Sequence, residues 1–86
     1  MDSSAIRVQL QQVLRKHLRA VAADETIPME EQLVDLGLDS IATIHLLLDL
    51  ETAFGVSFPG SMLTPETFRS GASLQQAVSS LVGARA

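Results

Sequence analysis

Apolar residues recur at helical spacing in three parts of the chain. In residues 4–21 most of them lie three or four positions apart, so this segment is predicted to be an amphipathic helix. Residues 40–54 and 74–82 follow a similar pattern. The apolar positions of the first of these helices are Ile6, Leu10, Val13, Leu14, Leu18 and Val21.

The predicted helix over residues 40–54 carries more apolar surface than one contact with a core requires. At 100° per residue, Leu47, Leu50 and Phe54 form one arc. A second, adjoining arc is made by Ile41, Ile44 and Leu48. Either this second arc is exposed to a partner, or the bundle buries both arcs. The pattern alone does not decide between these two possibilities.

The remaining segments connect these helices. Residues 22–39 form a long connection whose apolar side chains indicate that it packs on the core. Thr64 and Pro65 are typical of a helix start, so a short helix is predicted at residues 65–69. The sequence therefore predicts an all-α fold, a four-helix bundle with a long packed first loop and a short third helix, in one domain over residues 1–86.

Composition narrows the possible functions. The 86 residues contain no Cys, so disulfides and thiolate metal sites are excluded. Neither a secretory leader nor a membrane-spanning run is present, so we expect a soluble, cytoplasmic protein. Residues 21–68 carry nine acids and no Lys or Arg, which disfavours binding to nucleic acid or anionic lipid. Such a charge distribution either steers basic partners or serves only solubility.

One serine stands at a chemically distinctive place, Ser40 at the start of the second predicted helix. Either Asp39 or Ser40 is expected to cap this helix. The unpaired first-turn amides and the helix dipole make the position favourable for an anionic group.

Other kinds of site find little support in the sequence. A nucleophilic serine needs a base, but His45 lies about 140° around the helix from Ser40 and no Gly-x-Ser-x-Gly elbow surrounds the serine. The acids lack metal-binding spacing, and His17 has no second ligand at helical spacing. We therefore expect no catalytic residue and no metal site, and interpret Ser40 as a residue that another protein acts on.

The stretch Leu36-Gly37-Leu38-Asp39-Ser40-Ile41 resembles the attachment motif of acyl carrier and peptidyl carrier proteins, in which the serine bears 4′-phosphopantetheine. The resemblance extends over nearly the whole chain. It includes the loop with an Ile-Pro start, the run from Leu46 to Val56, the Thr-Pro-Glu-Thr-Phe segment and the short last helix. It implies a bundle of the acyl-carrier type.

The resemblance also implies how such a protein works. Ser40 would accept 4′-phosphopantetheine from coenzyme A through a phosphopantetheinyl transferase with magnesium. The arm's thiol would carry an acyl or aminoacyl group as a thioester, and the protein would be a monomer. Implied partners are an acyltransferase or adenylating enzyme and ketosynthase or condensation-type enzymes. The implied contacts with them on the second helix are Asp39, Ile41, Ile44, Leu48 and Glu51.

The second helix differs from that of the fatty-acid carriers. Ala42, His45 and Thr52 stand where those carriers usually have acids. The chain therefore looks more like a discrete carrier of polyketide, nonribosomal-peptide (antibiotic) or aminoacyl-transfer pathways, the absence of a linker favouring a discrete protein. The alternatives are a carrier of fatty-acid synthesis and a non-carrier interaction domain in which Ser40 only caps a helix. The sequence does not identify the cargo.

Overall fold

The computed structural model describes residues 2–19, 21 and 25–85. Residues 22–24 of the predicted loop and residue 20 of the predicted first helix lie outside the described residues, as do residues 1 and 86. Five helical elements make up the described chain: α1 (Ser3–Arg15), the 3₁₀ turn η1 (Leu33–Leu36), α2 (Ser40–Phe54), the 3₁₀ turn η2 (Gly60–Met62) and α3 (Gly71–Arg85). The all-α class is confirmed, with three α-helices in this described part instead of the four expected.

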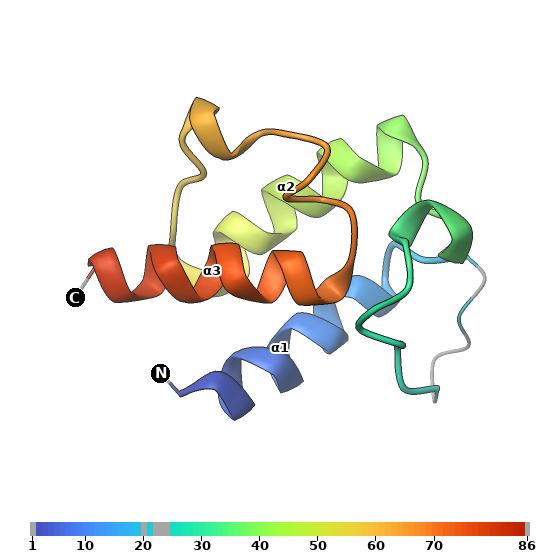
Figure 1. Ribbon diagram of the computed structural model, residues 1–86, viewed down its shortest axis with the longest axis horizontal. Coiled ribbons are helices and arrows are strands. Elements are labelled where there is room, and N and C mark those ends of the chain that lie inside the picture. The colour runs from blue at the N-terminus through green and yellow to red at the C-terminus, as the bar shows by residue number, and fades with distance from the viewer. Residues whose placement is uncertain (1, 20, 22–24, 86) are drawn as a thin grey trace.

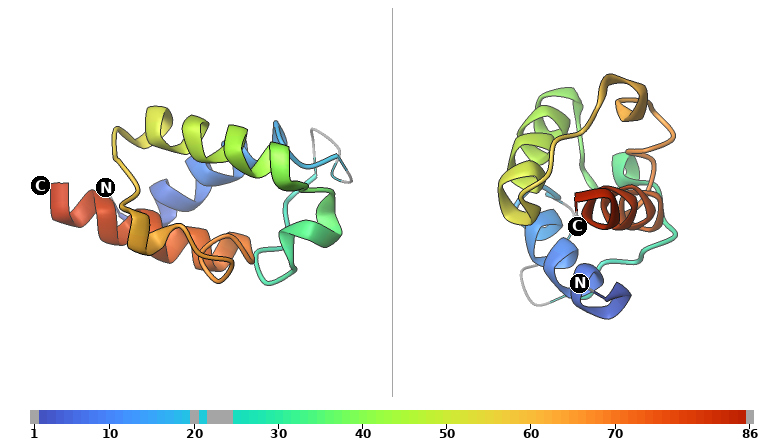
Figure 2. Two further views of the ribbon diagram at one scale, coloured as in Figure 1. Left: turned by 90° about the horizontal axis from the view of Figure 1, so that it is seen from above. Right: turned by 90° about the vertical axis from the view of Figure 1, so that its left-hand side faces the viewer.

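The three α-helices surround one core. In Figure 1, α3 crosses the middle of the view, α1 lies below it and α2 above it, and α1 contacts both of the other helices. Figure 2 shows that the two termini lie at one end of the molecule, whereas η1 and the start of α2 lie at the other. No helix among the described residues is long and apolar enough to cross a membrane.

Leucine dominates the core. The predicted apolar face of α1 is buried at Ile6, Leu10, Val13 and Leu14. Burying each large aliphatic side chain contributes on the order of 1.5–3 kcal/mol, so this small core depends on a few such residues. Eight of the largest are almost completely buried: Leu10, Leu14, Ile27, Leu33, Leu46, Leu50, Leu74 and Val78.

The long connection before α2 is packed, as the sequence predicted. Ile27, Met29, Leu33, Leu36 and Leu38 are all buried in the core. Burial of so many apolar side chains fixes the path of a segment that has only one short 3₁₀ turn of regular structure among its described residues.

Hydrogen bonds fix the backbone of the same connection. The side chain of Gln11, buried on α1, donates from Nε2 to the Ile27 carbonyl and accepts from the Ile27 amide, both at 3.2 Å. Farther along, the Leu33 amide donates to the Arg69 carbonyl at 2.8 Å. A buried amide side chain thus supplies both partners that an isolated stretch of backbone needs.

Helix α1 ends at Arg15, six residues before the predicted end at residue 21. The amides of Lys16 and His17 bond to carbonyls three residues back, which tightens and ends the helix. His17 then reaches α2, where its Nε2 lies 3.0 Å from Asp49 Oδ2. Leu18 is also buried, although it lies beyond the end of α1. The apolar spacing therefore predicted a longer helix than the structure contains.

The short helix predicted at residues 65–69 is a turn. Thr64 Oγ1 accepts from the Thr67 amide at 3.3 Å, as a cap would, but no helix follows. The chain instead pairs with the first loop: Gln32 and Ser70 form an isolated antiparallel bridge, next to the bond from Leu33 to Arg69. This pairing draws the backbone out of the helical conformation.

The last helix is longer than the predicted 74–82 and extends from Gly71 to Arg85. At the start of this helix, Ser70 and Ser73 each accept a hydrogen bond from the other's backbone amide. The Ser70 hydroxyl accepts from the Ser73 amide at 3.2 Å, and the Ser73 hydroxyl accepts from the Ser70 amide at 3.1 Å. This is the reciprocal arrangement of a capping box, so the helix starts earlier than its apolar pattern indicates.

Candidate functional site

The start of α2 is set by three successive residues. Gly37 ends η1 with φ of 98°, a left-handed conformation that favours glycine. Leu38 is then buried, and Asp39 is extended. Asp39 Oδ1 accepts from the Ala42 amide at 2.8 Å, so Asp39 is the N-cap of α2.

Ser40 is consequently the first residue of the helix and does not cap it. Ser40 is an exposed residue, and its hydroxyl lies at the positive end of a 15-residue helix. The amides of the first turn that the cap leaves unpaired point toward the same region. This combination suits a covalently attached anion, because neither burial nor a capping bond engages the hydroxyl.

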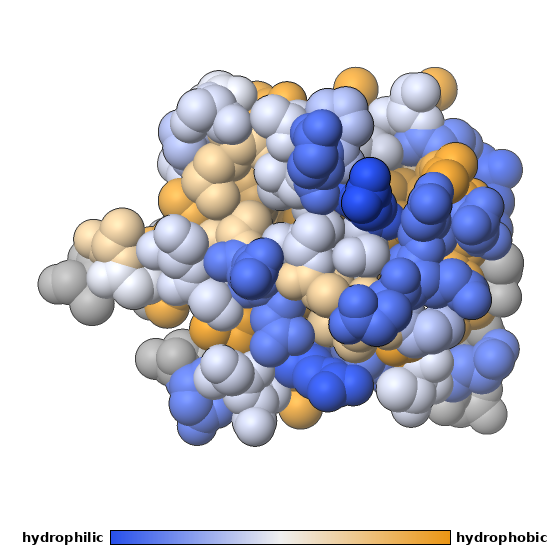
Figure 3. Space-filling view, in the orientation of Figure 1, coloured by the Kyte–Doolittle hydropathy of each residue, from blue (hydrophilic) through white to orange (hydrophobic). Residues whose placement is uncertain are grey.

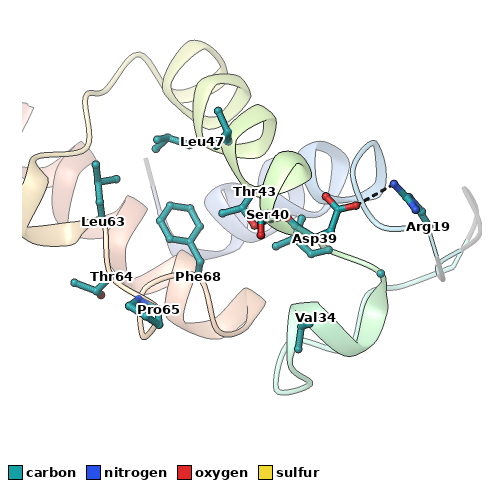
Figure 4. Close-up of a pocket in the computed structure, with 13 residues that line it drawn as sticks. Arg19, Val34, Asp39, Ser40, Thr43, Leu47, Leu63, Thr64, Pro65 and Phe68 are labelled. Carbon is teal, nitrogen blue, oxygen red and sulfur yellow. Dashed lines mark hydrogen bonds and ion pairs between the residues drawn. The ribbon is translucent and has the colours of Figure 1, made fainter.

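An open groove of about 910 Å³ adjoins Ser40. Figure 4 shows that one wall is α2 and the other is the turn that carries Leu63, Thr64, Pro65 and Phe68. Most of the lining is apolar, and Arg19 and Asp39 are the only charged residues in it among those that the structure describes. The remaining lining residues are Val34, Gly37, Leu38, Ser40, Thr43, Ile44 and Leu47.

Arg19 is a residue of this site that the sequence analysis missed. Its Nη2 lies 3.0 Å from Asp39 Oδ2, so an ion pair joins the connection that follows α1 to the cap of α2 (Figure 4). A signal for it existed in the sequence, because Arg19 is the last cation before a stretch without Lys or Arg.

The second apolar arc of α2 is exposed, which decides between the two interpretations of its pattern. Ile41, Ile44 and Leu48 expose 68%, 58% and 56% of their surface, whereas Leu50 and Phe54 are buried. Exposure of large aliphatic side chains along one helix face is typical of a protein-interaction site.

The two acids expected beside this arc have structural partners. Asp39 caps α2 and pairs with Arg19. Glu51 is half-buried, and its Oε2 accepts from the Phe58 amide at 2.8 Å. Glu51 therefore also holds the connection that follows α2.

The structure gives no support to hydrolytic or metal chemistry. His17 bonds to Asp49, and in the described part of the chain no hydrogen bond joins Ser40 to His17 or to the exposed His45. Among the described residues no group of three or more His, Cys, Asp or Glu could hold a metal ion. What the geometry offers is an exposed hydroxyl beside an apolar groove.

Comparison with known families agrees with this geometry. Residues 5–78 match the family model described as phosphopantetheine attachment site. The chain belongs to this family of carrier proteins. As a carrier protein it is acted on by partner enzymes and is not itself an enzyme.

Individual relatives are carriers of the aminoacyl type. The carrier protein is 33% identical to aminoacyl carrier protein 2 of Bradyrhizobium diazoefficiens, over 96% of each chain. It also resembles a chain in the crystal structure of an engineered Bradyrhizobium japonicum glycine:carrier protein ligase complexed with carrier protein from Agrobacterium tumefaciens and ATP. That match has a TM-score of 0.76 and 30% identity, over 86% of this chain and 96% of the other.

A related crystal structure contains the Bradyrhizobium japonicum ligase complexed with glycylated carrier protein. Its matching chain has a TM-score of 0.64 and 32% identity, over 87% of this chain and 95% of the other. All three matches span nearly the full length of the relative.

The cofactor of the carrier protein is 4′-phosphopantetheine, bound covalently. The residues at the start of α2 fit this group. A phosphodiester needs a hydroxyl that an external enzyme can reach, and Ser40 is exposed. The helix terminus favours the negative charge, and an open, mostly apolar groove of about 910 Å³ adjoins the hydroxyl.

The division of roles between Asp39 and Ser40 predicts unequal effects of their substitution on stability. Asp39→Ala removes the cap and should lower the free energy of unfolding by about 1 kcal/mol. Ser40→Ala removes no cap and should change it by less than about 0.5 kcal/mol. Urea denaturation of both variants measures the difference, with Asp39→Asn as a control that keeps a capping oxygen. Equal losses for both alanine variants would contradict the assignment of the cap.

Proposed function

We propose that the protein is an aminoacyl carrier protein that receives 4′-phosphopantetheine on Ser40. The observation that carries this proposal is the exposed Ser40 hydroxyl at the first position of α2, inside the matched region and beside the groove.

Other serines in the matched region fit the role less well. Ser70 is buried, and the hydroxyls of Ser70 and Ser73 are bound within the capping box of α3. Ser57 lies in the connection after α2, and Ser61 lies in the three-residue turn η2. Only Ser40 combines an exposed hydroxyl with the start of a long helix.

In the proposed reaction, the Ser40 hydroxyl attacks coenzyme A, displaces adenosine 3′,5′-bisphosphate and forms a phosphodiester. The transferase takes up the hydroxyl proton and binds the magnesium ion. The attached arm ends in a thiol, which a chain without Cys otherwise lacks and which carries the cargo as a thioester. The part played by the chain is to present the hydroxyl, to stabilise the new charge at the helix terminus and to dock partner enzymes.

We infer that the cargo is an amino acid loaded by an ATP-dependent adenylating ligase. Support comes from the relatives, one named an aminoacyl carrier protein and another found glycylated beside its ligase. Aminoacyl-transfer or nonribosomal-peptide pathways with condensation-type enzymes therefore fit better than polyketide pathways with ketosynthases or fatty-acid pathways. The cytoplasm is the proposed compartment.

The proposed docking face for these enzymes is the exposed arc of α2, with Ile41, Ile44 and Leu48 at its centre and Asp39 at its start. By contrast, the face over α3 and α1 is mostly hydrophilic, with apolar residues only in separate patches (Figure 3). Aliphatic side chains supply affinity and a flanking acid assists the encounter with a basic partner.

The attachment site is tested by intact-protein mass. After incubation with coenzyme A, magnesium and a broad-specificity phosphopantetheinyl transferase, the wild type should gain one phosphopantetheine unit and Ser40→Ala should gain none. Ser57→Ala is the matched control and should be modified like the wild type. Modification of Ser40→Ala, or none of the folded wild type, would refute the assignment.

The docking face is tested by loading kinetics. With the Bradyrhizobium japonicum glycine:carrier protein ligase, ATP and glycine, Ile44→Asp should lower the rate of thioester formation by about tenfold or more, because a charge replaces a central apolar contact. Val8→Asp is the control, since Val8 is 61% exposed but lies on α1. Equal rates for the two modified variants would contradict the proposed face.

A further inference from the structure

Modification of Ser40 creates an electrostatic problem that the unmodified chain does not have. Asp39 precedes Ser40 directly, and its Oδ1 is bound to the Ala42 amide at 2.8 Å. A phosphodiester on Ser40 would add a second negative charge close to this carboxylate. Asp39 cannot turn away from it without releasing the cap of α2. The helix terminus offsets part of this repulsion, and a nearby cation would offset more of it.

Arg19 is the cation that the structure places there. Among the described residues that line the groove it is the only Lys or Arg, and its side chain reaches Asp39, the residue before Ser40 (Figure 4). The next cation in the sequence is Arg69, which does not line this groove but an adjoining, smaller one of about 250 Å³ that shares Val34, Pro65 and Phe68 with it.

The geometry of Arg19 allows it to serve two anions. Only one terminal nitrogen of Arg19, Nη2, pairs with Asp39, at 3.0 Å. A guanidinium has five N–H donors in a planar fork, so others can bind a second anion. The Arg19 side chain is 80% exposed and that of Asp39 is 49% exposed. Ion pairs so exposed contribute little stability, so the side chain can move with little loss of stability.

We propose that Arg19 is the counter-ion of the phosphodiester on the modified carrier: it pairs with Asp39 in the unmodified chain and bridges Asp39 and the phosphate after modification. This rests on the proposed attachment at Ser40. In this role Arg19 is a positioning residue, which allows an acidic cap and a phosphodiester to occupy adjacent residues.

The test compares thermal midpoints before and after modification. In the wild type, modification should leave the midpoint nearly unchanged. In Arg19→Gln, modification should lower it by about 2–4 °C, since two like charges then face each other without a cation. The loss should shrink in roughly 1 M salt, where the Debye length is about 3 Å. Arg7→Gln is the control, because Arg7 is exposed on α1 and does not line the groove.

A second readout observes the phosphate directly. The ³¹P resonance of the modified protein should shift in Arg19→Gln and stay in place in Arg7→Gln. In an Asp39→Asn background, which keeps a capping oxygen, the effect of Arg19→Gln on the midpoint should fall to less than half, because the repulsion is gone. This double-variant comparison separates the proposed role from a general loss of charge.

The outcomes separate this inference from the proposed function. Mass measured on each sample shows whether Ser40 is modified at all, and an unmodified wild type would refute both proposals. If the protein is modified but Arg19→Gln behaves like Arg7→Gln in both readouts, the carrier function stands and the role of Arg19 is refuted.

Discussion

The site depends on how firmly the long connection between α1 and α2 is anchored to the core. Its described part has only one short 3₁₀ turn to order it, so burial of side chains such as Ile27 and Leu33 must do so. Two hydrogen bonds from buried Gln11 fix the backbone at Ile27, and the Arg69 carbonyl fixes it at Leu33. Without these anchors the first turn of α2 would have no defined position relative to the groove wall opposite.

Once the connection is fixed, the chemistry follows from which side chain performs which task. Asp39 caps α2, so the hydroxyl of Ser40 is available for modification. The core takes Leu50 and Phe54 from α2, which leaves the face with Ile44 exposed, and we propose that partner enzymes dock there. A protein of this size can therefore serve as a carrier without catalytic groups, because partner enzymes supply the chemistry.

Local patterns predicted the parts of the fold that local interactions determine. The predicted bounds of residues 40–54 match α2, which ends at Gly55 in a left-handed conformation with φ of 63°. Pairing between distant segments was not predictable from such patterns. Just beyond the early end of α1, His17 meets Asp49 on α2, and the contact of Arg19 with Asp39 joins residues twenty positions apart. The motif and the helix position were enough to propose Ser40 as the attachment site, whereas the groove beside it needed the three-dimensional structure.

The most direct test of the central claim, that the start of α2 and its groove form the attachment site, is a comparison of amide ¹H–¹⁵N NMR spectra before and after phosphopantetheinylation. The account predicts the largest shifts at Ser40 and Ile41, smaller ones at groove residues such as Val34 and Phe68, and almost none along α3. Largest shifts around another serine, for example Ser57, would contradict it.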